Sequence, residues 1–183
     1  MGIVVCVVGK ANSGKTTLLT HLIPRLTGHG LSIAAIKHHA HGDFEFDQEG
    51  KDSYRLREAG AKIERIFSPQ HGFAGEKQDN MIESGHGVHP ATGIPLVSLY
   101  GAAREPEPAM LAGLSALIVD LPDVGARVYT FLSTALLCLQ ACARARVPVV
   151  VLDRPNPLGG EILEGPVLRP EFSSFVGLIP VPL

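Results

Sequence analysis

The sequence has little of several features that mark particular classes of protein. It contains three cysteines, Cys6, Cys138 and Cys142, and each lies within an apolar run. An odd and sparse set of this kind indicates reduced core thiols and argues against a secreted framework stapled by disulfides. The formal net charge is only −2, which gives no electrostatic reason to expect nucleic acid or an anionic membrane as a partner.

Targeting and membrane signals are missing as well. No apolar run is long enough to span a bilayer, and no cationic region precedes Ile3, so we expect neither a transmembrane helix nor a secretory signal. We therefore expect a cytoplasmic protein. The composition is globular, with 45% hydrophobic and 19% charged residues in 183 positions, which is enough for one good core or two small ones.

Apolar runs alternate with helical patterns along the chain. The pattern predicts helices over residues 15–27 and 129–146 and strands over residues 3–8, 31–36, 63–67, 96–99, 116–121 and 147–152. This alternation indicates an α/β fold of the P-loop or Rossmann-like kind, with a mostly parallel sheet and flanking helices. Each of these strands lacks a polar face and needs cover on both sides, so we expect all six to join in one composite unit.

The first strand leads into a glycine-rich turn that fits G-x-x-x-x-G-K-[ST] at every fixed position. Glycines let successive N–H groups point into one concavity that can hold phosphate oxygens. Lys15 would place a positive charge on the terminal phosphates, and the Thr16 hydroxyl would ligate Mg²⁺. The expected nucleotide-binding residues are Gly9, Lys10, Ala11, Asn12, Ser13, Gly14, Lys15, Thr16 and Thr17.

Two further polar groups follow apolar strands. Asp120 ends the run at 116–121 and could hold Mg²⁺ through water, although polar residues are common at strand ends in any α/β sheet. His38, His39 and His41 follow the second strand and could bind a metal, but we favour a role as polar lining near the phosphates.

Residues 3 to about 61 resemble the start of the molybdopterin-guanine dinucleotide biosynthesis protein B family (MobB). The matching strings are GKANSGKTTLL, IAAIKHHAHG and FDQEGKDSYRLREAGA. The resemblance implies that this part binds GTP with Mg²⁺ and meets proteins of molybdenum cofactor biosynthesis. It also implies that Lys37 and His38 belong to the nucleotide-side loop.

Residues from about 63 to 183 resemble a different family, the exo-β-N-acetylmuramidases of peptidoglycan turnover (NamZ-like). The matching strings are IFSPQHGFAGEKQDNMIES, GIPLVSLYG, DLPDVGARVYTFLST, VVVLDRPNPLGGEILEGPVL and FSSFVGLIPVP. This resemblance implies a Rossmann-like domain, followed in the family by a second domain, that acts on terminal N-acetylmuramic acid of glycan ends. The chain thus divides into a partial nucleotide-binding segment at 1–61 and a partial muramidase-like segment at 62–183.

Glycoside cleavage generally uses two carboxyl groups that flank the bond. Many relatives carry Glu where this chain has Gln70, and an amide cannot exchange a proton at neutral pH, so attention moves to Glu83. We expect the catalytic residues of this segment to include Glu83, His71, Asp123 and Arg127. Arg127 could hold the lactyl carboxylate of the substrate.

Three functions follow from these patterns. The first is purine nucleotide binding, with GTP expected and with slow or absent hydrolysis, because no residue can be assigned to orient the attacking water. The second is a glycoside hydrolase that acts on muramyl glycan ends. The third is a fusion product that has neither activity. The phosphate loop is short, local and intact, and this ranks nucleotide binding first.

Overall fold

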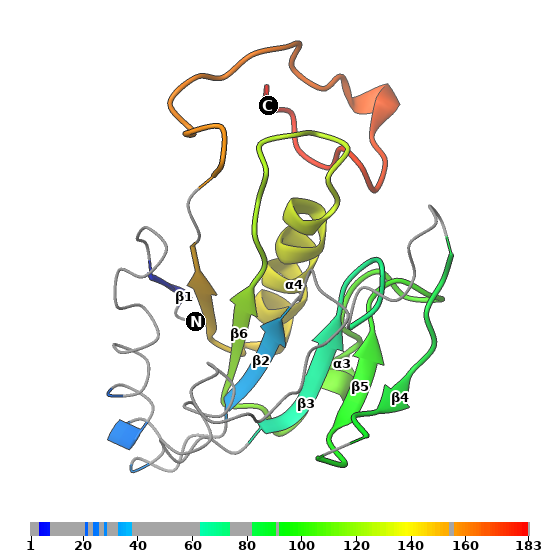
Figure 1. Cartoon of the computed structure of the whole chain (residues 1–183), viewed down its shortest axis with the longest axis vertical. Helices are drawn as coiled ribbons and strands as arrows, with labels where there is room; N and C mark the ends of the chain where they lie inside the picture. Colours follow the sequence, from blue (N-terminus) through cyan, green and yellow to red (C-terminus); the bar gives the residue numbers. More distant parts are fainter. Residues whose placement is uncertain are drawn as a thin grey trace.

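We describe the chain from a computed structural model (Figure 1). The described residues are 4–7, 21, 24–25, 28, 33–37, 63–73, 82–90, 92–153 and 156–182. The expected phosphate loop at 9–17 and the loop after the second strand lie outside them. Among the described residues, no helix is long and apolar enough to cross a membrane.

The strands form one seven-stranded sheet in the order β1-β7-β6-β2-β3-β5-β4. Their bounds are β1 Val4–Val7, β2 Ile33–Lys37, β3 Ile63–Ser68, β4 Gly87–Val88, β5 Pro95–Ser98, β6 Ala116–Asp120 and β7 Val149–Leu152. Every neighbouring pair is parallel except β4 with β5. The prediction that the six apolar strands join in one mostly parallel sheet is therefore confirmed.

Two strands of the N-terminal segment pair with strands of the muramidase-like segment. β1 pairs only with β7 and lies at one edge of the sheet, whereas β2 pairs with β6 on one side and with β3 on the other. The antiparallel strand β4 forms the opposite edge, in a stretch where the sequence predicted no strand. A strand of two residues carries too little periodicity to be recognised from sequence.

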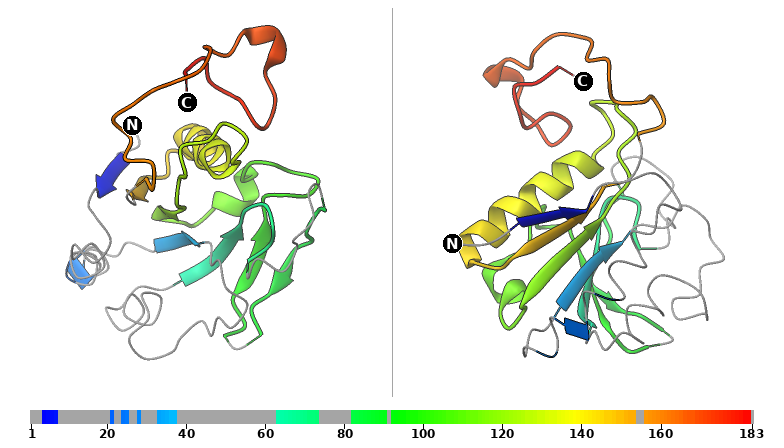
Figure 2. Two further views of the ribbon diagram at one scale, coloured as in Figure 1. Left: turned by 45° about the horizontal axis from the view of Figure 1, so that its top comes forward. Right: turned by 90° about the vertical axis from the view of Figure 1, so that its left-hand side faces the viewer.

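Helix α4, Phe131–Ala145, covers one face of the sheet (Figure 2). The short helix α3, Pro108–Leu111, contacts α4. The core between them contains Cys138 and Cys142 from α4, which confirms these two cysteines as buried free thiols. The sheet contributes Phe67, Leu117, Val119 and Val149 to the same cluster. Because these side chains of the sheet are apolar, the helices can pack directly against them.

The ends of two elements differ from the expected bounds for local reasons. β7 begins at Val149 rather than at Val147, because Pro148 has no N–H to give to a ladder, although its carbonyl accepts from Leu117 at 2.8 Å. α4 ends at Ala145 rather than at Arg146, because Arg146 adopts the left-handed conformation with φ 59° and donates its N–H to the helix carbonyls as the C-cap. The first expected helix is represented by His21, Pro24, Arg25 and Gly28, all in helical conformation.

We predict that Ala35→Pro strongly destabilises the protein. Ala35 pairs with Ile118 of β6 and with Ile66 of β3, so proline at this position removes a donor from the middle of the sheet. We expect a loss of about 3 kcal/mol in the free energy of unfolding, as for proline inside regular structure. Urea unfolding followed by circular dichroism measures it, with Ala102→Pro in an exposed loop as the control. Equal stability of the two variants would contradict the central place of β2.

Candidate functional site

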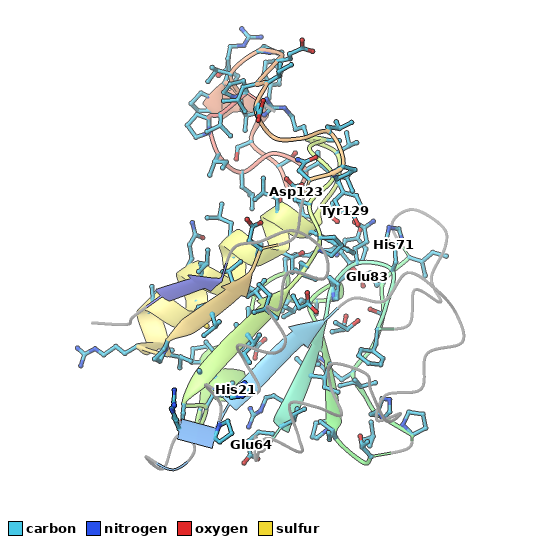
Figure 3. The ribbon with its side chains drawn as sticks, turned by 60° about the vertical axis from the view of Figure 1, so that its left-hand side comes forward. His21, Glu64, His71, Glu83, Asp123 and Tyr129 are labelled. Carbon is cyan, nitrogen blue, oxygen red and sulfur yellow. The ribbon has the colours of Figure 1, made fainter. Side chains whose placement is uncertain are left out.

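Loops that carry the candidate residues meet at the carboxyl ends of the parallel strands. The segments after β3, β5 and β6 emerge at this end, which is where open α/β sheets bind ligands. Figure 3 shows His71, Glu83, Asp123 and Tyr129 toward this end, and His21 and Glu64 toward the other. Three of the four residues expected to be catalytic therefore belong to one region of the fold.

The turn after β3 has an unusual backbone. His71 has φ 76° and Gly72 has φ 83°, so two successive residues lie in the left-handed region. Glycine adopts this conformation freely, whereas histidine does so at a cost, and such positions concentrate at functional sites. The Gly72 N–H donates to the Pro69 carbonyl at 3.3 Å and closes the turn.

Glu83 lies over the end of β5. The next residue, Ser84, donates its N–H to the Tyr100 carbonyl at 2.9 Å, and its hydroxyl contacts that of Ser98 at 2.8 Å. The Glu83 carboxylate is 3.6 Å from the Arg104 guanidinium, and its side chain is 61% exposed. Glu83 is thus an accessible carboxylate with a cation beside it.

Arg104 connects this region to the C-terminal segment. Its guanidinium carbon lies 3.7 Å from the centre of the Tyr100 ring and 5.3 Å from that of Phe175. The two rings are 5.8 Å apart. Cations are attracted to aromatic faces at these distances. Arg104 and Tyr100 therefore hold Phe175 against the loop after β5. Arg104 was not predicted from the sequence, because no local pattern shows that Phe175 comes near it.

The loop after β6 is held by Asp123 and lies close to Asn156. The Asp123 carboxylate accepts a hydrogen bond from the Gly125 N–H at 3.3 Å, which forms a local turn. Gly125 has φ 68°, and a Cβ there would come within 2.7 Å of the Asn156 amide nitrogen. Any other side chain at this position would push Asn156 away from the loop.

Tyr129 lies at the end of the same loop. Burial raises the pKa of its phenol above the ordinary value, and the negative charge of Asp123 adds to the effect. Its ring packs against that of Phe131 with the ring centres 4.7 Å apart. The phenol therefore keeps its proton across the neutral range and can donate a hydrogen bond.

Arg127 holds the C-terminal segment in place. Its Nη2 donates to the Pro166 carbonyl at 2.8 Å and to the Val181 carbonyl at 2.9 Å. Its Nη1 is buried and has no hydrogen-bond partner among the described residues. Arg127 and Tyr129 also line a pocket between α4 and the segment around Gly177, which is otherwise largely apolar.

Only some of the residues predicted for nucleotide and metal binding are among the described residues. Asp120 is buried at the end of β6, in register with Lys37 of β2. Strand β7 lies between β6 and β1, the strand that leads to the phosphate loop. No group of three metal-ligating side chains occurs within the described part of the chain. Residues Gly9 to Thr17 and His38 lie outside it, so their predicted roles stay predictions.

The amino-acid sequence matches known proteins from two families. Residues 13–183 match the family described as exo-beta-N-acetylmuramidase NamZ, N-terminal. The chain is 44% identical over 122 residues to peptidoglycan beta-N-acetylmuramidase NamZ of Bacillus subtilis, covering 67% of this chain and 29% of that protein. The family match begins within the glycine-rich turn, so it extends well into the segment that resembles MobB.

Parts of the chain also match molybdopterin-guanine dinucleotide biosynthesis adapter proteins. The identity is 48% over 60 residues with the Escherichia coli protein, covering 33% of this chain and 34% of that protein. It is 30% over 120 residues with the Haemophilus influenzae protein, covering 64% of this chain and 67% of that protein. Both resemblances seen in the sequence are therefore confirmed.

The fold is similar to that of a DUF1343 family protein from Bacteroides fragilis, with a TM-score of 0.70 and 28% identity. The likeness covers 90% of this chain and 41% of that chain. The α/β fold with a parallel sheet is confirmed, and its structural relatives are of this NamZ-like kind. The chain spans 29% of the length of the Bacillus subtilis relative.

We predict that Tyr129→Phe removes a phenol of raised pKa from the alkaline titration of the protein. Asp123→Asn should lower that pKa only part of the way, because burial is the larger cause and remains. The raised pKa adds stability below the ordinary value of 10.0, and this stability is lost as pH rises through the folded-state pKa. Phenolate absorbance measures the titration. Asp153→Asn is the control, and an equal effect of both substitutions would contradict the Asp123 contact.

Proposed function

Since the chain belongs to the family of NamZ N-terminal domains, we propose that it binds the N-acetylmuramyl end of peptidoglycan glycans. The proposed site comprises the carboxyl ends of β3, β5 and β6 with the loops that follow them. Its ligand would be a sugar that bears a carboxylate on its lactyl ether. The related Bacillus subtilis protein is named a peptidoglycan beta-N-acetylmuramidase.

The buried Nη1 of Arg127 is the observation that carries this proposal. A buried cationic donor without an acceptor is costly, and a ligand carboxylate would satisfy it. The other guanidinium nitrogen, Nη2, is occupied by the Pro166 and Val181 carbonyls, so the side chain is already held in one orientation. Tyr129 lines the same pocket and adds a phenol that stays protonated. A preorganised guanidinium next to a hydroxyl suits recognition of a carboxylate.

The nearby acidic residues are candidates for bond cleavage. Glycosidases place one carboxyl group as acid and another as base or nucleophile on either side of the scissile bond. Glu83 and Asp123 lie toward the same end of the sheet and would take these roles. His71 belongs to the strained turn at the same end and would contact the sugar.

We predict that the protein binds N-acetylmuramic acid at least 10-fold more tightly than N-acetylglucosamine. The two sugars differ by the lactyl ether, and a hydrogen bond to a charged group contributes about 1.5–3 kcal/mol, which is about 10- to 100-fold in affinity. Calorimetric titration of the intact chain measures both ligands. The methyl ester of N-acetylmuramic acid keeps the ether and removes the charge, so it should bind like N-acetylglucosamine.

A pair of arginine variants tests which arginine binds the carboxylate of the sugar. Arg127→Lys should weaken binding of N-acetylmuramic acid and leave that of N-acetylglucosamine unchanged. Arg144→Lys alters an exposed arginine on α4 that pairs with Glu105 at 2.7 Å, and it should change neither. Equal affinity of the wild-type protein for both sugars would refute the proposed site.

Nucleotide binding is a second candidate, favoured by the 48% identity to the Escherichia coli adapter protein over 60 residues. We propose that GTP with Mg²⁺ binds at Gly9 to Thr17, where the carboxyl end of β1 leads into the turn. Thr16 would ligate Mg²⁺, and Lys37 and His38 would line the nucleotide side. In this role the protein would work in the cytoplasm with proteins of molybdenum cofactor biosynthesis.

We predict that Lys15→Ala weakens binding of GTP–Mg²⁺ by about 10- to 100-fold, since it removes a charged donor to the terminal phosphates. Titration with GTP and with ATP, each with and without Mg²⁺, measures the affinity and the choice of base. Lys62→Ala, outside the motif, is the matched control. No binding of either nucleotide to the wild-type protein, or equal binding by wild type and Lys15→Ala, would remove this candidate.

A further inference from the structure

Thr130 immediately precedes helix α4, but its side chain does not cap the helix. Threonine at such a position usually accepts a hydrogen bond from an N–H of the first turn. Here the backbone of Thr130 is already helical, with φ −79° and ψ −4°, and the hydroxyl donates to Gln70 Oε1 at 2.6 Å. The hydroxyl therefore serves a residue 60 positions away in the sequence rather than its own helix.

The receiving residue belongs to the strained turn after β3. Gln70 directly precedes His71 and Gly72, whose φ angles are both positive. A non-glycine residue keeps such a conformation only where its surroundings fix it. The hydrogen bond from Thr130 supplies a side-chain restraint from another element of the fold.

The hydrogen bond between Thr130 and Gln70 is buried and is held rigidly on the Thr130 side. Thr130 is 7% exposed and Gln70 is 8% exposed, so water cannot easily replace either partner. The backbone of Thr130 is itself held by α4, because its carbonyl accepts from the Thr134 N–H at 2.9 Å and from the Thr134 hydroxyl at 3.1 Å. The donor thus rests on a regular helix, which is a more exact support for a site than a loop.

We propose that Thr130 is a positioning residue, whose hydroxyl fixes the turn at Gln70 and thereby sets the place of His71. The same residue ends the loop that carries Asp123 and Tyr129, so one hydrogen bond sets His71 relative to that loop. The backbone part of this inference stands on the geometry alone. Its consequence for ligand binding rests on the proposed glycan function.

The test compares Thr130→Val, which keeps the shape and loses the hydroxyl, with Thr130→Ser, which keeps the hydroxyl. Nuclear magnetic resonance of the intact, unliganded chain reports the backbone at His71 through its Cα and Cβ shifts, and the imidazole through its ring resonances. We expect Thr130→Val to move both sets of resonances and Thr130→Ser to leave them near the wild-type positions. Binding of N-acetylmuramic acid should weaken about 10-fold in Thr130→Val and recover in Thr130→Ser.

Thr134→Val is the matched control, because it removes a buried hydroxyl one turn further along α4 and keeps the Thr134 N–H that holds the Thr130 carbonyl. It should leave the His71 resonances unchanged. Should Thr130→Val fail to fold, Gln70→Met removes the acceptor instead and should shift His71 in the same way. Unchanged His71 resonances in the folded variant, or an equal shift in Thr134→Val, would overturn the proposal.

The positioning role of Thr130 and the glycan function can be refuted separately. If the wild-type protein does not bind N-acetylmuramic acid, the glycan function is refuted, while the His71 resonances still decide whether Thr130 positions the turn. If the sugar binds but Thr130→Val leaves affinity and resonances unchanged, the function stands and the positioning role is refuted.

Discussion

The double pairing of β2 is the constraint on which the rest of the structure depends. This strand hydrogen-bonds to β6 through one edge and to β3 through the other, so it joins the two halves of the sheet. Without it, β3 and β6 would each present an open edge, and the loops after them would have no fixed spacing. Parallel pairing then brings the carboxyl ends of β3, β5 and β6 to one side, where the candidate residues gather.

Much of this fold could be predicted from the sequence because strands such as β6 and β7 are largely apolar on both faces. The run at 116–121 has no alternative to burial between two layers, and the observed strand Ala116–Asp120 is buried throughout. The order of the strands could not be predicted. Nothing in Val4–Val7 indicates that this strand pairs with β7 at an edge, because pairing depends on tertiary contacts that local patterns do not record.

The candidate site was likewise predictable only in part. Loop residues after strands were predictable, since polar side chains at carboxyl ends share one edge, and His71, Glu83 and Asp123 do lie toward that end. Their supports were not predictable. Arg104 reaches Phe175, Arg127 reaches Val181, and Thr130 reaches Gln70, and each contact joins segments far apart in the sequence. The intact phosphate-loop motif made nucleotide binding the first functional prediction from the sequence. The family match over residues 13–183 gives the muramidase-like site more support.

The strand order also separates β1, the strand that leads toward the proposed nucleotide site, from the strands of the proposed sugar site. Neighbouring strands lie about 4.8 Å apart, so β1 and β3, with three strands between them, are about 19 Å apart across the sheet. A nucleotide at the turn after β1 and a sugar over the ends of β3 and β5 would therefore occupy different regions of the same edge. The same spacing puts β6 about 10 Å from β1. Asp120 ends β6, the strand that leads into the loop of Asp123, whereas β7 lies between β6 and β1.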